Sequence, residues 1–317
     1  MKILITGIHG FVGSNLVTYL AKDNEIYGLD IVSPEKEGVV KTFSWDDLDN
    51  ESVPNVDAII HLAGKAHDTK KQSAAEVYFK VNTELTKKIY DYFLAHDSIR
   101  KFVFFSTAKA AADRVDGILT ENVVPAPIGP YGESKIAAER YILDHMPTKD
   151  STTNAVNKQV YIFRPCMIHG PGNKGNLNLL FNIVKKGIPW PLGAFENRRT
   201  FTSIENICFA VNGVLTKDVS SGIYNMGDDE PLSTNELIEE ICKSLGKKAH
   251  IWRLPKGLMN SVAKMGGWLH LPLNPDRLQK LTESYVSSNA KIKKALGVDK
   301  MPVDARQGLK ITLKSFQ

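Results

Sequence analysis

Tyr131 and Lys135 stand four positions apart in the stretch YGESK, and this pairing of a phenol with an amine is a candidate acid–base site. On a helix, residues four apart lie on the same face, so the two side chains would be neighbours. A phenol with a pKa near 10 is a poor base at neutral pH unless a nearby positive charge favours the phenolate. The chain has ten tyrosines and many lysines, so about one such spacing is expected by chance and the surrounding elements must decide.

The elements around this pair have the pattern of an α/β protein. Continuous apolar strands separated by helices indicate a parallel sheet that is covered on both faces. We therefore predict a doubly wound parallel sheet, the Rossmann arrangement, in which ligands bind at the carboxyl ends of the strands. Within the first 165 residues the predicted strands cover 2–6, 25–30, 56–63, 101–107 and 159–165, and the predicted helices cover 10–22, 74–96 and 131–145.

A glycine-rich turn follows the first predicted strand. Gly7, Gly10 and Gly13 in TGIHGFVG permit a tight turn and let the backbone approach a pyrophosphate at the N-terminus of the first helix. Asp30 ends the next strand, where its carboxylate can accept hydrogen bonds from an adenosine ribose and would repel a 2′-phosphate. The turn therefore predicts NAD as the cofactor, in preference to NADP.

After Arg164 the amino-acid composition of the sequence changes. RPCMIHGPGNKGN and GIPWPLGAFENRR are rich in Gly, Pro and Asn, and they are predicted to be loops over the mouth of a cleft. The polar stretch 146–158 is also predicted to be a loop. Further elements are predicted as a helix at 201–215, a strand at 222–227 and a capped helix at 233–246.

These patterns divide the chain into two parts. Residues 1–165 are expected to form the NAD-binding domain, with 201–227 returning to it. Residues 166–200 and 228–317 are expected to form a smaller, mixed α/β lobe that binds the substrate. The amphipathic stretch 255–281 is expected to lie in the core of this lobe, in preference to a membrane-surface element.

Composition limits the classes of function. The net charge of +5 suits an anionic small substrate, and no dense basic face with a reading motif indicates nucleic-acid binding. The three cysteines are few, odd in number and not spaced as metal ligands, so we expect a reduced cytoplasmic setting and no metal site. MKILITG lacks the charged segment and long apolar run of a signal peptide, so we expect none, and no apolar run of about 18 residues predicts insertion into a membrane.

Seven segments carry a resemblance to a known family. TGIHGFVG, HLAG, FFSTA, YGESK and RPCMIHGPG occur in the order found in extended short-chain dehydrogenases/reductases, which include the NAD-dependent nucleotide-sugar epimerases and dehydratases. NRRTFTSIENI and YVSSNAKIKKALG extend the resemblance over nearly the whole chain. It implies that Tyr131 is the catalytic tyrosine, that Lys135 is its partner, and that Thr107 shares a hydrogen bond with the sugar hydroxyl.

The resemblance also implies two sets of binding residues. The cofactor would contact Gly7, Gly10, Phe11, Val12, Gly13, Asp30, Leu62, Ala63, Gly64, Ser106, Tyr131, Lys135 and Pro165. The substrate would contact Thr107, Asn176, Trp190, Leu192, Arg199 and Arg277. The two arginines would grip the diphosphate, because a guanidinium pairs with phosphate oxygens bidentately. Trp190 and Leu192 would either flank the nucleotide base or serve as ordinary packing, and Asn82 resembles an asparagine that steadies the active-site strands.

Departures from the family pattern narrow the reaction. Dehydratases place an acidic pair directly after the catalytic threonine, whereas this chain has Ala108 and Lys109, so sugar dehydration is disfavoured. Many epimerases carry an asparagine near the position of Met167, so a standard galactose epimerase site is also disfavoured. The texture from Arg164 to Arg199 resembles the branch that acts on UDP-N-acetylhexosamines and their 6-deoxy-4-keto derivatives in bacterial surface polysaccharide synthesis.

Three functions stay open. The first is an NAD-dependent 4-epimerase of a UDP-hexose or UDP-N-acetylhexosamine, which works through a transient 4-keto sugar. The second is an NAD(P)H-dependent reductase of a UDP-4-keto-6-deoxy-hexosamine. The third is a nucleotide-binding regulator that has lost the chemistry, although Tyr131 and Lys135 are both intact. The family also implies a homodimer formed through a pair of helices.

Overall fold

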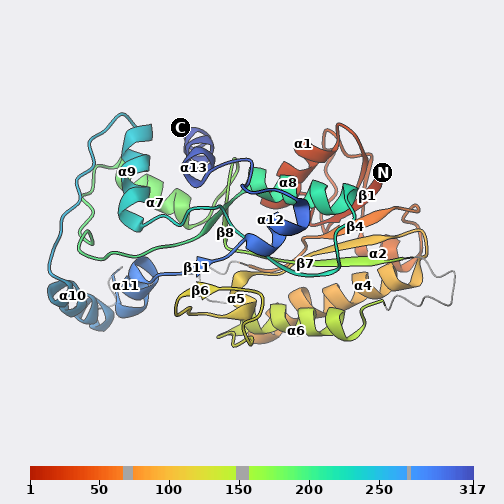
Figure 1. The fold of residues 1–317 in the computed structure, drawn as a ribbon, viewed down its shortest axis with the longest axis horizontal. Coiled ribbons are helices and arrows are strands. Elements are labelled where there is room, and N and C mark those ends of the chain that lie inside the picture. The colour runs from red at the N-terminus through yellow and green to blue at the C-terminus, as the bar shows by residue number, and fades with distance from the viewer. Residues whose placement is uncertain (67–73, 148–156, 270–272) are drawn as a thin grey trace.

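A parallel sheet of seven strands organises the computed structural model, which describes residues 1–66, 74–147, 157–269 and 273–317 (Figure 1). Its strand order is β10-β7-β5-β4-β1-β2-β3, so the chain starts near the middle and winds outward in both directions. The predicted doubly wound fold is therefore confirmed. The strands are β1 (Lys2–Thr6), β2 (Glu25–Leu29), β3 (Lys41–Phe43), β4 (Ala58–His61), β5 (Lys101–Phe105), β7 (Gln159–Pro165) and β10 (Gly222–Met226).

Helices cover both faces of this sheet (Figure 1). Alternate side chains of each strand point to opposite faces, so β1 sends Ile3 and Ile5 into one core and Leu4 into another. The first core is closed by α1 (Phe11–Leu20), α8 (Ile204–Thr216) and α12 (Ala290–Leu296), and the second by α2 (Trp45–Asp49), α4 (Leu85–Ala95) and α6 (Pro130–Asp144). Both β10 and α8 come from the stretch 201–227, and α12 lies with them against the sheet.

Some elements of the sheet domain differ from the prediction. The helix predicted over 74–96 consists of α3 (Ala75–Phe79), a π-helical turn η1 (Lys80–Glu84) and α4. The helix predicted from residue 201 begins only at Ile204, because Phe201–Ser203 is strand β9. The short β3 and α2 were not predicted, since three to five residues are too few for a periodic pattern.

The smaller lobe has a separate hydrophobic core. Two small parallel sheets, β8–β9 and β6–β11, lie beside its helices. Its elements are α7 (Asn176–Lys185), α9 (Thr234–Ser244), α10 (Lys256–Trp268), α11 (Pro275–Thr282), α13 (Ala305–Lys314), β8 (Met167–His169), β9 (Phe201–Ser203), β6 (Ile118–Leu119) and β11 (Val286–Ser287), with the short α5 (Ala108–Ala111) nearby. The capping box predicted at Ser233 or Thr234 is present, and the structure assigns it to Ser233 with Glu236 as its partner.

Two segments predicted as loops are partly ordered by pairing. Met167–His169 forms β8 against β9, and Trp190 and Leu192 form bridges to Ile251 and Arg253. Trp190 and Leu192 are buried in the core of the lobe, so the prediction of cleft loops is wrong for them. The partners lie far away in the sequence, which is why the Gly- and Pro-rich texture concealed the pairing. The loop predicted over 146–158 falls mostly outside the described residues.

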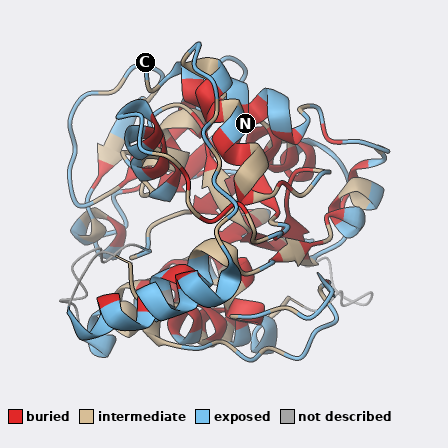
Figure 2. Ribbon diagram, turned by 90° about the vertical axis from the view of Figure 1, so that its left-hand side faces the viewer, coloured by how far each residue is buried: buried red, intermediate tan, exposed pale blue. Residues whose placement is uncertain are grey.

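Helices α10 and α11 lie at the end of the molecule that is farthest from the sheet (Figure 1). Met259 and Ala263 of α10 and Leu278 of α11 enter the lobe core, as predicted for the stretch 255–281. The prediction holds for one face of α10 only, because Met265 and Trp268 on another side are exposed. Figure 2 looks onto this end of the molecule. None of the described helices is long and apolar enough to cross a membrane.

Candidate active site at the strand ends

The carboxyl ends of β1, β4, β5 and β7 lie side by side at one edge of the sheet. The pairing register aligns Thr6 with His61, His61 with Phe104, and Phe105 with Phe163. The predicted catalytic and cofactor-binding residues follow these ends directly or begin the adjacent helices. The structure therefore brings together, at one edge, motifs that are separated by more than a hundred residues in the sequence.

The hydroxyl of Thr107 lies near the hydroxyl of Tyr131. Burial raises the pKa of the Tyr131 phenol, and the neighbouring Thr107 hydroxyl lowers it in part. The Thr107 oxygen already accepts a hydrogen bond from the backbone N–H of Lys109 at 3.3 Å, so its own hydrogen is available to a phenolate at Tyr131. Thr107 can hold this position because it is the N-cap of α5.

Lys135 lies one helical turn after Tyr131 on the buried side of α6. Its ammonium donates a hydrogen bond of 2.9 Å to the carbonyl oxygen of Phe105, the last residue of β5. Burial lowers the pKa of Lys135 to about 8, and the negative charge of Glu139 opposes this shift. A Cβ atom at Gly64 would lie 3.1 Å from the Lys135 nitrogen, so glycine at that position leaves room for the amine.

A buried ion pair supports the lysine from behind. Glu139, one further turn along α6, accepts hydrogen bonds from Nε of Arg164 at 3.0 and 3.1 Å and from the hydroxyl of Ser106. All three side chains are buried. The sequence reasoning missed Glu139, although Tyr131, Lys135 and Glu139 recur at a spacing of four and therefore share one helix face. That spacing was the signal that could have found it.

Asn82 lies in the π-helical turn η1 and connects two segments of the site. Its side-chain oxygen accepts from the backbone N–H of Lys65 at 2.7 Å, and its amide donates to Lys65 O and to Ser134 Oγ, each at 3.0 Å. The turn after β4 is thereby tied to α6, next to Lys135. π-Turns are frequent at functional sites, and here the turn aims Asn82 between two elements.

A relay of hydrogen bonds fixes the turns after β1 and β4. Thr6 Oγ1 accepts from the N–H groups of Leu62 and Ala63, so its own hydrogen goes to Nδ1 of His61. Nε2 of His61 then donates to Thr86 Oγ1, which in turn donates to the carbonyl of Asn82. This relay requires a neutral imidazole, and burial lowers the pKa of His61 well below its usual range. His61 thus has a full set of protein partners.

The glycine turn fits a bound pyrophosphate. A Cβ atom at Gly7 would lie 3.0 Å from the backbone nitrogen of Ala63, and one at Gly13 would lie 2.6 Å from the Gly7 oxygen. The N-terminus of α1 has no side-chain cap and no acidic residue in its first turn, so its N–H groups and positive dipole end face outward. Phe11 and Val12 open this helix.

The carboxylate of Asp30 stands just beyond β2, where the ribose of a dinucleotide was predicted. It accepts hydrogen bonds from the backbone N–H groups of His9 at 3.1 Å and of Ile31 at 2.8 Å. These two bonds orient the carboxylate beside the glycine turn and leave lone pairs for ribose hydroxyl groups. The residues present therefore fit NAD.

The residues predicted to bind the substrate are distributed unevenly. Arg199 is half-buried and donates a hydrogen bond of 2.6 Å to the carbonyl of Lys280 in α11, the helix that also carries Arg277. Burial lowers the pKa of Arg199, while nearby Glu283 opposes this shift. Asn176 is the exposed first residue of α7, and its contact with a substrate stays a prediction. Trp190 and Leu192 lie in the lobe core, which favours the packing role that was left open.

The positions that follow Thr107 carry no acid. Ala108 is buried. The ammonium of Lys109 donates to the backbone oxygen of Asp113 at 2.6 Å and to its carboxylate at 3.0 Å. Pro165 ends β7 on the far side of β5 and is buried. Among the described residues, no group of three His, Cys, Asp or Glu side chains is placed to hold a metal ion.

Comparisons with known proteins agree with this arrangement. The model of the NAD dependent epimerase/dehydratase family matches residues 3–227. A UDP-glucose 4-epimerase of Vibrio cholerae is 29% identical over 339 aligned positions, which cover 99% of this chain and 95% of the relative. The N-acetyl-alpha-D-glucosaminyl-diphospho-ditrans,octacis-undecaprenol 4-epimerase of Escherichia coli is 27% identical, with 92% of this chain and 85% of the relative covered.

The fold is also found among solved structures. The UDP-glucuronic acid 4-epimerase of Bacillus cereus in complex with NAD superposes with a TM-score of 0.74 at 20% sequence identity. The superposition covers 100% of this chain and 98% of that chain. At this identity the likeness establishes the common fold of the two proteins.

Proposed function

The chain belongs to the NAD-dependent epimerase/dehydratase family, and we propose that within this family it is a 4-epimerase of a sugar diphosphate. The proposed substrate is a UDP-hexose or a UDP-N-acetylhexosamine. The epimerase relatives support this choice, since one acts on UDP-glucose and the other on a diphosphate-linked N-acetylglucosamine. The substrates in the names of both relatives contain a hexose attached to a diphosphate.

In this proposal Tyr131 is the acid–base residue. NAD⁺, when bound, supplies the hydride acceptor for carbon 4 of the sugar. Tyr131, as phenolate, takes the proton of the hydroxyl at carbon 4. Thr107, whose hydroxyl lies near that of Tyr131, orients the sugar hydroxyl by a hydrogen bond of its own. Lys135 stabilises the phenolate by its charge and stays in place through its bond to Phe105 O.

The second half of the reaction returns the hydride to the other face of the 4-keto sugar. Tyr131, now protonated, gives its proton back to the oxygen at carbon 4. The sugar must turn between the two half-reactions while its diphosphate stays held. We assign that holding role to Arg199 and Arg277, because guanidinium groups pair with phosphate oxygens in two bonds at once.

The observation that carries the proposal is the pair of residues after Thr107. Elimination of water from the sugar needs a further acid and base beside the threonine. Ala108 offers neither, and Lys109 is engaged by Asp113. The site is therefore equipped for transfer of a proton and a hydride, which is the chemistry of an epimerase or a reductase. Asp30 favours NAD over NADP and so favours the epimerase, whose cofactor remains bound through each cycle.

An assay with defined substrates tests this proposal. Purified protein is incubated with UDP-glucose, UDP-N-acetylglucosamine, a UDP-4-keto-6-deoxy-hexosamine or undecaprenyl-diphosphate-linked N-acetylglucosamine, each with and without added NADH or NADPH. Interconversion of 4-epimers without added reductant is the expected result. Stoichiometric oxidation of NADH or NADPH by the 4-keto sugar would replace the epimerase with the reductase. No turnover of any sugar diphosphate by protein that carries NAD would contradict both.

A further inference from the structure

Helix α10 carries apolar side chains on two sides, which lie about 100° apart around its axis. Met259, Ala263 and Gly266 face the lobe core and are buried. A second stripe lies on the solvent side, where spacings of four, three and four residues place its members on one helix face. This outer stripe consists of Leu258 (51% exposed), Val262 (36%), Met265 (55%) and Leu269 (50%), with Trp268 (80%) beside it.

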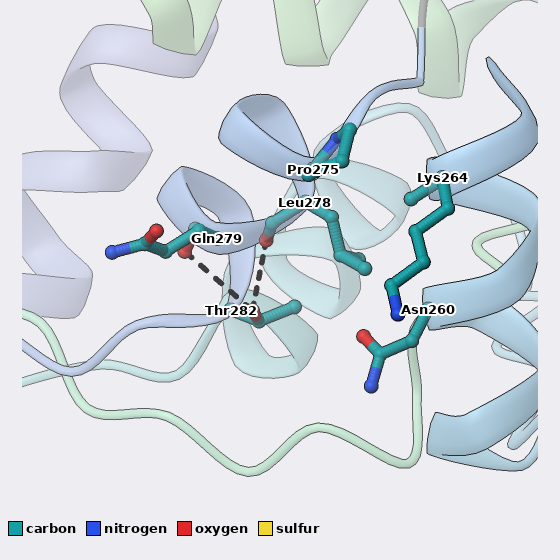
Figure 3. A pocket seen from close by; sticks show the side chains of 7 residues that line it. Asn260, Lys264, Pro275, Leu278, Gln279 and Thr282 are labelled. Atoms are coloured by element: carbon teal, nitrogen blue, oxygen red, sulfur yellow. Dashed lines mark hydrogen bonds between the residues drawn. The ribbon is translucent and has the colours of Figure 1, made fainter. Parts of the chain in front are cut away.

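The outer stripe is exposed, and among the described residues no partner covers it. Helix α10 packs mainly against α11, and even there a hollow of about 340 Å³ separates the two helices. Figure 3 shows Asn260 and Lys264 of α10 facing Leu278 and Thr282 of α11 across this hollow. A contiguous exposed apolar surface on a folded protein usually marks an interaction site.

The charge around the stripe identifies the kind of partner. Residues 241–275 contain no Asp or Glu, although acids make up 35 of the 317 residues and about four would be expected in a stretch of this length. The same stretch contains six basic residues, and all of them are exposed: Lys243, Lys247, Lys248, Arg253, Lys256 and Lys264. Lys256 and Lys264 lie on α10 and Arg253 shortly before it, whereas Lys247 and Lys248 line a hollow beside α7 and α9. The stripe therefore stands on a helix whose own charged side chains are all basic.

We propose that the outer stripe of α10 docks this protein onto an anionic membrane surface. The helix would lie in the plane of the interface, with Leu258, Met265 and Leu269 in the outer hydrocarbon and Trp268 at the level of the headgroups. Lys256 and Lys264 of α10, with Arg253 before it, complement anionic lipid headgroups. This is peripheral binding, since none of the described helices can span a bilayer.

Two other occupants fit the surface less well. A second copy of the chain in a two-fold contact would place the same patch against itself, so that cations would face cations. The homodimer predicted from the resemblance would have to use another surface. A nucleic acid would satisfy the basic residues but would leave the stripe of leucine and methionine exposed, because its outer surface is made of charged phosphates.

Docking would orient the proposed active site. Helix α11, which packs on α10, carries Arg277 and accepts the hydrogen bond of Arg199. This consequence rests on the proposed function, in which the two arginines hold the substrate diphosphate. The diphosphate end of the site would then be the end nearest to the bilayer. The docking itself depends only on α10 and its surround, so it can be tested without a substrate.

Vesicle flotation of the full-length protein tests the proposal. Vesicles of phosphatidylcholine alone are compared with vesicles that also contain about 30% phosphatidylglycerol. Wild-type protein is expected to float with the anionic vesicles and to be released at about 1 M NaCl, where the Debye length is about 3 Å. Wild-type protein that stays unbound on anionic vesicles at low salt would overturn the proposal.

Substitutions locate the contact. Each of Leu258→Ser, Met265→Ser and Leu269→Ser is expected to weaken vesicle binding about tenfold, because each removes an apolar side chain from the interface. Lys256→Glu with Lys264→Glu is expected to weaken it at low salt while leaving the stripe intact. Tyr19→Ser with Val40→Ser removes exposed apolar side chains from the sheet domain and should leave binding unchanged.

Two readouts separate docking from misfolding and from self-association. Turnover of a soluble UDP-sugar reports that each variant is folded, and a failure of that assay in every protein would concern the proposed function and not the docking. Sedimentation velocity without vesicles reports oligomers. Vesicle binding that the α10 variants retain in full would overturn the proposal. If the wild-type protein does not bind vesicles but forms an oligomer, and the Leu258, Met265 and Leu269 variants lose that oligomer, the stripe would be the contact with a second copy of the chain.

Discussion

The strand-end edge of the sheet and the α10 end of the lobe are built in opposite ways. At the strand ends, Thr6, His61 and Asn82 are fully buried and hydrogen-bonded. Glycines there let backbone segments pack so closely that an added Cβ atom would lie within about 3 Å of a neighbouring atom. On α10, large apolar side chains such as Met265 and Trp268 face solvent. The first region holds the proposed catalytic residues in fixed positions, and the second presents an exposed apolar surface.

The relatives include epimerases whose names give different carriers for the sugar, uridine diphosphate in one and a diphosphate-linked polyprenol in another. A dense hydrogen-bonded edge tolerates little change, because each buried polar group depends on its partner. An exposed helix face can change without disturbing the fold. We therefore expect substitutions at the strand ends to have large effects and those on the outer stripe to have almost none in solution.

Removal of the Tyr131 hydroxyl should have the largest effect. Tyr131→Phe keeps the ring but deletes the group that exchanges the proton, so turnover of the true substrate should fall about 10²–10⁴-fold. NAD binding should be retained, since the glycine turn and Asp30 are untouched. Steady-state kinetics of epimerisation measure the loss.

A second tyrosine on the same helix serves as the control for this prediction. The hydroxyl of Tyr141 donates a hydrogen bond to Asp91 of α4, and Tyr141→Phe should leave turnover close to that of wild type. If Tyr131→Phe retained turnover within about tenfold of wild type, another group would have to be the acid–base residue.

Glu139→Gln should have the next largest effect, and on stability. The substitution leaves the buried guanidinium of Arg164 without its counter-charge and weakens the bond from Ser106. Removal of one partner of a buried ion pair costs about 3–5 kcal/mol, which denaturant unfolding can measure. The exposed pair of Lys87 and Glu84 provides the comparison, since Glu84→Gln should cost less than about 1 kcal/mol. Equal losses at both sites would contradict the buried pair's importance.

Much of the strand-end edge was predictable, and the reason is local. Its strands are apolar runs and its turns hold glycines at fixed offsets. The positions of Gly7, Thr107 and Tyr131 at this edge could therefore be predicted from residues nearby in the sequence. Glu139 escaped because its importance depends on Arg164, which lies on another element. The pairing of Trp190 with residues 250–252 and the π-turn at Asn82 depend on distant partners in the same way. The exposure of one side of α10 could not be predicted either, because its amino-acid sequence is equally typical of a core helix.

Lys135 should make the free energy of unfolding depend on pH. Burial lowers its pKa from 10.5 to about 8, so a buried ammonium opposes folding below pH 8, and this penalty is relieved as the pH rises toward 10.5. The shift corresponds to roughly 3 kcal/mol, of which loss of the bond to Phe105 O would take back about 1 kcal/mol. Lys135→Met should therefore be inactive but more stable than wild type at pH 7.

The pH dependence distinguishes this explanation from a simple gain in packing. The advantage of Lys135→Met should shrink as the pH rises from about 8 to about 10, because the wild-type lysine then becomes neutral in the folded state as well. Unfolding free energies of both proteins, measured without NAD across this range, check the trend. An advantage that stayed constant with pH would assign it to packing.

The smallest effect is expected on the outer stripe of α10, and two methionines on this one helix give a matched test. Met259 is buried in the lobe core and Met265 is 55% exposed, so the same change to alanine samples both sides of the helix. Met259→Ala should lower the unfolding free energy by about 2–5 kcal/mol, because it leaves a cavity. Met265→Ala should change it by less than about 0.5 kcal/mol, since water already surrounds much of that side chain. Alanine favours the helix at either position, so helix propensity does not explain a loss of stability. A large loss at Met265 would mean that the outer stripe is already packed against protein in solution. A surface packed in that way could not be the one that contacts a membrane.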